Sequence, residues 1–330
     1  MEQHKSRRLV LMPSPLQGHI IPILELAGIL HSKGFSIVIV HTNFNSPDSS
    51  AYPNFTFLSI PDGLSETEAA DPVYLTDLIN IRCATPLREC LAKLLCDGSR
   101  EPVSCFISDA ALHFTRAVCD GLQLPRLVLR TGGASSFVIF ASFPLLREKG
   151  YLPVQDSRLE EPVPEFAPLK VKDLPKMETR DPDGFYKFVC HVVDECKASS
   201  GLIWNTFEEL ESSALTRLRQ EFSFPIYQIG PFHKYFPTGS PASSLLIPDR
   251  NQKVNAKYAS DVWKVGLQLP NVPDRGEIEK TIRKLMLGSE GKEIRDNVLN
   301  LKEKANLCMR DGGSSFCSLE NLVNHILSLK

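Results

Sequence analysis

Short apolar runs alternate with helical spacing of apolar residues through the first 230 positions of the chain. The runs have the pattern of buried strands and cover residues 9–12, 35–40, 55–60, 103–107, 127–129, 201–204 and 226–229. Helical spacing follows most of them, first at Ile20, Ile23, Leu24, Ala27 and Leu30. Repeated βα units form a parallel sheet with helices on both faces. The pattern therefore predicts a doubly wound α/β domain over residues 1–232.

Further helices are predicted between and after these runs. Residues 75–95 have the spacing of one long helix or of two shorter ones around Pro86. Helical spacing also covers residues 185–197 and 208–218, whereas the proline-rich residues 150–176 have none. Such an irregular segment is typical of a surface excursion and, in an enzyme, of a wall over the site.

The pattern changes after Gly230 and Pro231. Residues 233–251 are rich in Pro, Ser and Gly without periodicity, which predicts a linker. Residues 252–330 then show a helix at about 254–263, a short strand at 265–269, and two or three helices that begin near Arg275, Lys292 and Ser315. One strand does not form a sheet of its own. We therefore expect this mostly helical remnant to pack on the first domain or to be poorly ordered.

Composition and charge narrow the class of protein. Hydrophobic residues make up 42% of the 330 residues and charged ones 23%, as in a soluble globular protein, and the net charge of −2 favours neither nucleic acid nor an anionic membrane as a partner. No apolar run is long enough to span a bilayer. The nine cysteines include no C-x-x-C pair, and the histidines have no metal-ligand spacing. We expect a cytoplasmic protein with reduced thiols and without a metal site.

His19 is the first candidate for chemistry. It follows the strand at 9–12 and a loop broken by Pro13, Pro15 and Gly18, and it precedes a helix in which Pro22 suits the first turn. The carboxyl end of a strand is where ligands bind in an α/β sheet. A helix N-terminus disfavours a cationic imidazole, so His19 is a candidate general base. A structural or merely exposed histidine is the competing interpretation.

Asp109 ends another strand of the same predicted sheet. A carboxylate that accepts a hydrogen bond from one imidazole nitrogen fixes the tautomer and leaves the other nitrogen as base. Asp109 is therefore a candidate orienting partner for His19. The alternative is that Asp109 caps a helix that begins near Ala110, since aspartate is favoured at that position.

Thr131 ends a third strand and precedes Gly132 and Gly133. Its hydroxyl either contacts a ligand or caps the following helix. The glycines match neither a dinucleotide-binding fingerprint nor a P-loop, and no G-x-S-x-G elbow is present. Aromatic residues are candidates for an apolar pocket wall or for ordinary helical core, namely Phe137, Phe140, Phe143, Phe185, Tyr186 and Phe188.

Several segments together resemble the plant family-1 UDP-glycosyltransferases, two-domain enzymes of the GT-B fold. Their sequences are most similar to the branch that includes cytokinin N-glucosyltransferases. The similarity covers most of residues 8–230 and 252–329. The segments that carry it are PLQGHIIP at 15–22, IPDGL at 60–64, FISD at 106–109, GYLP at 150–153, NTFEELE at 205–211 and IGPF at 229–232.

The resemblance implies a reaction and roles for residues. His19 would deprotonate a small acceptor, Asp109 would orient His19, and Thr131 and Gln252 would contact the sugar of the donor. The reaction would be a direct displacement at the anomeric carbon of UDP-glucose with inversion. The acceptor would be a phenolic, terpenoid or cytokinin-like molecule with a hydroxyl or amine. UDP-sugar would be a co-substrate, and no further cofactor would be needed.

The donor-binding part of the family pattern is missing. The chain contains neither the strand V-x-Y-V-S-F-G-S nor the signature box with W-A-P-Q and H-x-G-W-N-S. Instead it passes from Arg250 through Asn251 to Gln252, and Gln252 matches the last residue of the signature box. Three or four βα units, on the order of 100 residues, are absent. Three hypotheses remain: an active transferase, a catalytically silent relative that binds an acceptor or pairs with an intact homologue, and the product of a skipped exon or faulty gene model.

Overall fold

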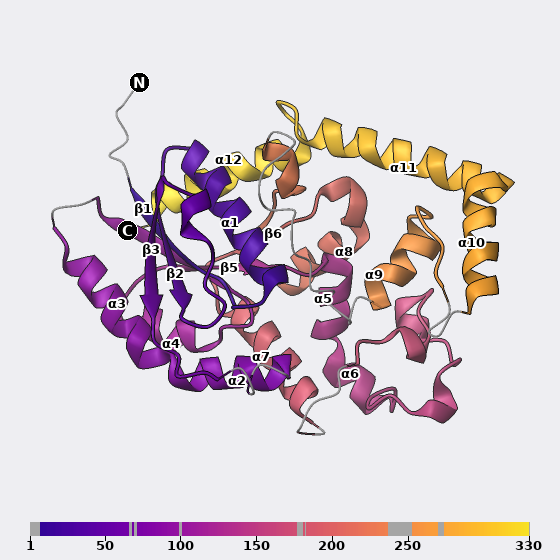
Figure 1. Ribbon diagram of the computed structural model, residues 1–330, viewed down its shortest axis with the longest axis horizontal. Coiled ribbons are helices and arrows are strands. Elements are labelled where there is room, and N and C mark those ends of the chain that lie inside the picture. The colour runs from indigo at the N-terminus through magenta and orange to yellow at the C-terminus, as the bar shows by residue number, and fades with distance from the viewer. Residues whose placement is uncertain are drawn as a thin grey trace.

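A seven-stranded parallel sheet forms the centre of the molecule (Figure 1). The structure is a computed structural model that describes residues 7–65, 68, 71–98, 101–176, 181, 183–236, 253–269 and 274–329. The strand order is β3-β2-β1-β4-β5-β6-β7, and every neighbouring pair is parallel. The strands are β1 (Arg8–Met12), β2 (Ser36–Thr42), β3 (Phe55–Ile60), β4 (Val103–Asp109), β5 (Arg126–Arg130), β6 (Leu202–Trp204) and β7 (Ile226–Gln228). The predicted doubly wound α/β fold is confirmed.

Alternation along the strands divides the core between the two faces of the sheet. Leu9 and Leu11 of β1 pack with helix α1 on one face, whereas Val10 and Met12 pack with α2 to α4 on the other. Val128 of β5 belongs to a third cluster with α5, α7 and α8. The helices after these strands are α1 (Gln17–Ser32), α2 (Pro72–Arg82), α3 (Ala84–Cys96), α4 (Phe114–Gly121), α5 (Ala134–Ala141), α6 (Phe143–Glu148), α7 (Gly184–Lys197) and α8 (Glu208–Glu221).

Two boundaries differ from the sequence prediction. Helix α1 begins at Gln17, so Pro22 lies in its second turn and not in the first. The helical stretch around Pro86 is two helices, but they divide at Cys83, and Pro86 lies in the first turn of α3, where a missing N–H costs no helical hydrogen bond. Residues 150–176 are irregular as predicted, with three short 3₁₀ turns at Asp156–Arg158, Pro164–Phe166 and Val171–Asp173.

The C-terminal part is helical. Helix α9 (Lys253–Lys257) continues into a π-helical turn at Tyr258–Val262, and α10 (Arg275–Leu287), α11 (Ser289–Cys308) and α12 (Ser314–Ser328) follow. The strand predicted at 265–269 is wrong, since these residues form no strand. A strand requires a neighbour for its backbone hydrogen bonds, and the sheet of the first domain takes none from this segment. Of the predicted linker, residues 237–251 lie outside the described residues.

Helix α12 packs on the sheet of the first domain. Leu319, Leu322 and Ile326 are buried in the same cluster as β1 and α1. Arg7 donates a hydrogen bond to the carbonyl of Leu329 at 3.1 Å, and Tyr227 Oη lies 2.6 Å from His325 Nδ1. The helix therefore completes the face of the sheet that α1 covers only in part, and the expectation that the remnant packs on the first domain is met for this helix.

Candidate functional site

The side chain of His19 lies at the carboxyl end of the sheet. It is the third residue of α1, and its backbone N–H donates to the carbonyl of Leu16 at 2.8 Å in the first turn. The loop that precedes it follows β1, so the strand and the helix together fix the position of the imidazole. The side chain is 22% exposed, which leaves part of the ring accessible to a small molecule.

Asp109 lies at the end of β4, which pairs directly with β1 through Met12 and Ser108. His19 Nδ1 is 2.7 Å from Asp109 Oδ2, and the Asp109 side chain is only 1% exposed. The other carboxylate oxygen, Oδ1, accepts a hydrogen bond from the N–H of Ala111 at 2.8 Å. The two oxygens thus bind different partners, and the carboxylate is held in the orientation that contacts His19.

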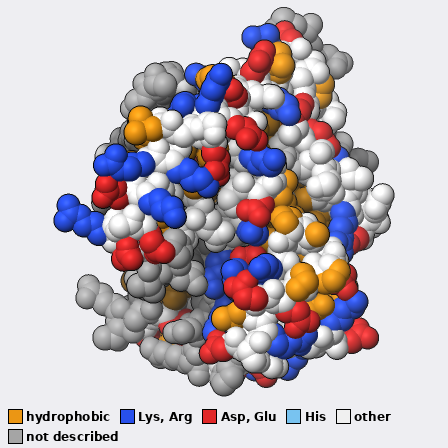
Figure 2. All heavy atoms as spheres, turned by 90° about the vertical axis from the view of Figure 1, so that its right-hand side faces the viewer, with side chains coloured by type: hydrophobic (Ala, Val, Ile, Leu, Met, Phe, Trp, Pro, Cys, Tyr) orange, Lys and Arg blue, Asp and Glu red, His pale blue; other side chains and the backbone are white. Residues whose placement is uncertain are grey.

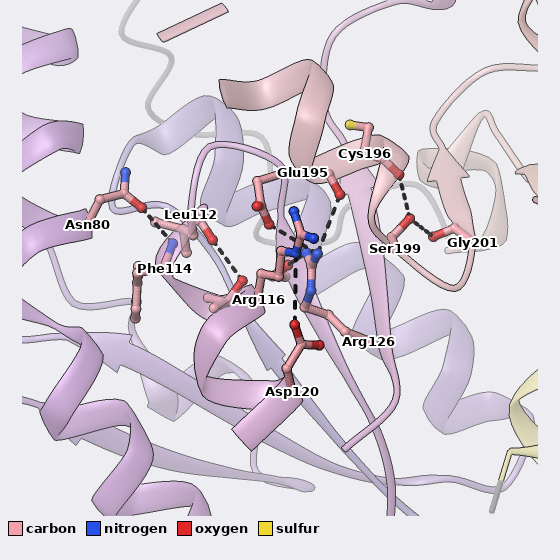
Figure 3. Close-up of polar contacts among 12 residues, drawn as sticks. Asn80, Leu112, Phe114, Arg116, Asp120, Arg126, Glu195, Cys196, Ser199 and Gly201 are labelled. Atoms are coloured by element: carbon pink, nitrogen blue, oxygen red, sulfur yellow. Dashed lines mark hydrogen bonds and ion pairs between the residues drawn. The ribbon is translucent and has the colours of Figure 1, made fainter. Parts of the chain in front are cut away.

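The alternative role for Asp109 as a helix cap is wrong. Helix α4 begins at Phe114, after a turn that separates it from the strand. The side chain of Asn80 on α2 binds this turn through two hydrogen bonds. Its Nδ2 donates to Ala111 O at 3.0 Å, and its Oδ1 accepts from Phe114 N at 3.1 Å. Figure 3 shows the contact between Asn80 and Phe114. The turn after β4 is therefore fixed at both ends, and with it the backbone that orients Asp109.

A buried ion pair fixes the next strand. Arg126 at the start of β5 lies 3.0 Å from Glu195 of α7, and both side chains are largely buried (Figure 3). Burial raises the pKa of Glu195 to about 6, and the opposing charge of Arg126 limits this rise. Removal of one partner would leave a buried charge without compensation. The pair joins β5 to α7 and so helps to position the strand that Thr131 follows.

Thr131 also lies beside the imidazole. Its Oγ1 is 3.4 Å from His19 Nδ1. The following helix begins at Ala134 with Gly133 as N-cap, so the alternative in which Thr131 caps this helix is wrong. The structure therefore brings together three of the four predicted site residues, from the ends of β1, β4 and β5. The fourth, Gln252, lies outside the described residues.

Sequence reasoning missed Glu211. This residue interrupts α8 with non-helical dihedrals (φ −129°, ψ 33°), and its carboxylate accepts hydrogen bonds from Ala134 N at 3.0 Å and Ser135 N at 2.8 Å. It is 4% exposed. Helix N-termini attract anions, and here the chain's own carboxylate fills that position on α5. An acid in an amphipathic helix gives no sequence signal for this role.

The aromatic candidates divide between two roles. Phe137 is fully buried against Trp204, so it is core. Phe143, Phe185 and Tyr186 instead line a small hollow of about 140 Å³ beside Pro153 and Pro175 of the irregular segment. Arg130 lies over the rings of Phe137 and Phe140, at 5.6 and 5.2 Å from their centroids. Three residues of the aromatic set therefore line a hollow, and Phe137 is core.

Neither a cluster of metal ligands nor a membrane-spanning helix is found among the residues that the structure describes. In the ranges that the structure describes, no three His, Cys, Asp or Glu side chains lie together as metal ligands would. Over the same ranges no helix has both the length and the apolar character that a bilayer crossing requires.

Known proteins resemble this chain both in sequence and in structure. No family model matches the chain. It is 34% identical to UDP-glycosyltransferase 76B1 of Arabidopsis thaliana, over 99% of this chain and 100% of that protein. It is 33% identical to UDP-glycosyltransferase 76G1 of Stevia rebaudiana, over 98% of both. The Arabidopsis alignment runs over 451 positions, whereas the chain has 330 residues, so at least 121 aligned positions have no residue of this chain.

Solved structures share the fold. Phytolacca americana UGT2, complexed with UDP-2fluoro-glucose and pterostilbene, matches with a TM-score of 0.77 and 18% identity over 97% of this chain and 100% of that one. Medicago truncatula UGT71G1, complexed with UDP-glucose, matches with a TM-score of 0.76 and 17% identity over 99% of this chain and 100% of that one.

Proposed function

Since the chain belongs to the plant UDP-glycosyltransferases and has their GT-B fold, we propose that it retains the acceptor-activating half of sugar transfer and has lost most of the donor-binding half. Members of this family transfer a sugar from a UDP-sugar to small molecules. The observation that carries the first part is the 2.7 Å contact between His19 and Asp109. The second part rests on the missing signature box and on the unmatched positions in the alignment.

His19 acts as the general base in this proposal. With Nδ1–H donated to the buried carboxylate of Asp109, the neutral imidazole has its basic lone pair on Nε2. Nε2 takes the proton of an acceptor hydroxyl or amine while the acceptor atom attacks the anomeric carbon of the sugar. The bond from that carbon to the diphosphate oxygen breaks, UDP departs with the electron pair, and the configuration inverts.

Asp109 is a positioning residue in this scheme. It touches the base and not the substrate, and its 1% exposure keeps water away from the contact. A carboxylate in this position holds the imidazole in one tautomer and stabilises the imidazolium that forms during the reaction. Thr131, from the end of the neighbouring strand, supplies a hydroxyl at the same place, and we assign it to the sugar of the donor together with Gln252.

The acceptor is a small molecule with an apolar body. Phe143, Phe185 and Tyr186 line one hollow, and the solved structure of Phytolacca americana UGT2 is complexed with pterostilbene. We therefore assign phenolic, terpenoid or cytokinin-like acceptors to this chain, with either oxygen or nitrogen as the attacking atom. The site chemistry is the same for both because only the proton on the attacking atom moves to His19.

Loss of the donor half explains why turnover is expected to be absent. In the described residues after 252 there is no strand and hence no second sheet to carry a diphosphate site. Removing even one preorganised hydrogen-bond donor that stabilises developing negative charge raises the activation free energy by about 3 kcal/mol, which lowers the rate roughly a hundredfold. Removal of the whole site would bring transfer below detection. What remains in this proposal is a protein that holds an acceptor without turnover, which the contact between His19 and Asp109 supports; the competing function is an active transferase.

A transfer assay separates these functions. Purified chain is incubated with UDP-glucose and a panel of hydroxyl and amine acceptors, and products are followed by mass spectrometry, with His19→Ala as the matched control. We expect acceptor binding in equilibrium dialysis and no product. Product formation that disappears in His19→Ala would overturn the loss of the donor half, and absence of acceptor binding would overturn the retained half. A genomic segment that encodes H-x-G-W-N-S between Arg250 and Asn251 would identify this form as a splicing or gene-prediction product.

A further inference from the structure

Exposed apolar side chains gather in the C-terminal helices. Of the eleven large apolar side chains that are exposed in the described residues, nine lie between positions 262 and 307. Helix α10 is the extreme case, because none of its thirteen residues is buried. It stands at the edge of the molecule and packs against α11 (Figure 1). Figure 2 views the molecule from that edge and shows apolar side chains interspersed among charged ones.

Three apolar residues of α10 form a stripe, whereas Leu287, which is 79% exposed, lies on the opposite side of the helix. Ile278, Ile282 and Met286 are spaced four residues apart, so each lies about 40° further around the helix than the one before. Their side chains are 37, 55 and 62% exposed. An amphipathic surface helix buries such a stripe against a partner. Here the stripe has no cover within the described chain.

The charges of α10 are arranged so that two copies complement each other. Its first half carries Glu277 and Glu279 after the N-cap Asp274, with Arg275 as the one base, and its second half carries Lys280, Arg283 and Lys284. A parallel pair of such helices would oppose like charges. An antiparallel pair, related by a two-fold axis through the middle of the helix, places each acidic half beside the basic half of the partner.

We propose that α10 is a self-association surface, on which a second copy of this chain packs as an antiparallel helix pair through Ile278, Ile282 and Met286. Glu279 and Arg283 lie on the flank of the stripe and pair within one helix at 2.8 Å. In the dimer the same two side chains are within reach of their counterparts, which gives a network of four charges. The proposal does not depend on whether the chain transfers sugar.

The dimer should be weak. A helix of thirteen residues is about 20 Å long, and one such pair buries less than the roughly 1,200 Å² of a standard stable complex. We therefore expect a reversible dimer with a dissociation constant on the order of 10 μM and a rise of that constant with salt, since the flanking charges are exposed.

Sedimentation equilibrium over a range from about 1 to 200 μM tests this proposal. We expect a reversible monomer–dimer equilibrium that Ile282→Lys shifts to monomer by at least about tenfold in the dissociation constant. Ile81→Lys is the matched control, because Ile81 is 75% exposed on α2, away from α10, and should leave the dimer unchanged. Circular dichroism verifies that both variants remain folded.

Charge exchange tests the antiparallel arrangement itself. A basic variant (Glu279→Lys) and an acidic variant (Arg283→Glu) alter the two charges on the flank of the stripe; each should remain monomeric, and an equimolar mixture of the two should dimerise. Monomer at all concentrations would overturn the proposal. So would open-ended aggregation, dimerisation that ignores Ile282→Lys, or a mixture that fails to associate.

Discussion

His19 Nδ1 and Asp109 Oδ2 lie 2.7 Å apart although ninety positions separate the two residues in the chain. The contact forms because β1 and β4 are neighbours in a parallel sheet, Asp109 ends β4, and His19 lies in the first turn of the helix that follows β1. Asp109 is anchored a second time by Ala111 N. The base and its orienting carboxylate are thus both supplied by the first domain, from α1 and β4.

The tautomer of His19 is the first prediction. Donation of Nδ1–H to Asp109 should hold the neutral imidazole in the Nδ1–H form, and Asp109→Asn should mix the two forms because an amide can donate as well as accept. Long-range ¹H–¹⁵N correlation spectra of histidine-labelled protein measure the tautomer, with His19→Gln to assign the signals. A predominant Nε2–H form in the unaltered chain would contradict the assignment of Nε2 as base.

Glu211 should contribute to stability through the N-terminus of α5. Glu211→Ala removes the acceptor for Ala134 N and Ser135 N in a buried place, and we expect a loss of about 2–3 kcal/mol in the free energy of unfolding. Urea unfolding measures it. Glu221→Ala on the same helix is the control, because Glu221 pairs with Arg217 at the surface and its loss should cost less than about 1 kcal/mol. Equal effects of the two substitutions would refute the role of Glu211.

Helix α12 should be part of the cooperative core of the first domain. Leu322 is fully buried against the sheet, and Leu322→Ala should lower the free energy of unfolding by about 2–5 kcal/mol. Leu299→Ala on α11 changes the same side chain at a position that is 62% exposed, and it should have little effect. The outcome that speaks against this role is a separate unfolding transition for α12 with the first domain unaffected.

Acid should destabilise the protein through His113. Burial, with a further contribution from the neighbouring His191, lowers the pKa of His113 to about 4, and the two rings lie 4.7 Å apart. The unfolded chain, with a histidine pKa of about 6.5, binds this proton more readily, so stability is full above about pH 6.5 and falls as the pH drops toward 4. Because the ring is partly exposed, we expect a loss of only about 1 kcal/mol. His113→Asn should flatten this slope in urea titrations, and an unchanged slope would exclude His113 as its source.

The sequence was sufficient to locate the seven strands of the sheet and to place His19, Asp109 and Thr131 together at one edge of it. The apolar runs end at Pro, Gly or polar residues, and a parallel order places all of these ends on one edge, so His19, Asp109 and Thr131 could be grouped before any contact was known. Their distances could not be derived, because they depend on which strands are neighbours. The 3.4 Å from Thr131 to His19 is an example.

Other features depend on tertiary structure alone. Glu211 has the sequence pattern of a surface acid, and only the approach of α5 and the interruption of α8 make it a cap. The run at 265–269 has the pattern of a strand, but no neighbouring strand is available to it. In both cases the local pattern was compatible with two structures, and the packing of distant segments determined which one formed.

Calorimetric titration of the purified chain with UDP, followed by UDP-glucose, tests the central proposal most directly. We predict no saturable binding of either nucleotide up to about 1 mM, because a diphosphate site needs fixed donors that the described residues after 252 do not provide in a second sheet. Binding of UDP in the micromolar range, together with glucose transfer that His19→Ala abolishes, would contradict the loss of the donor half and would establish an active transferase.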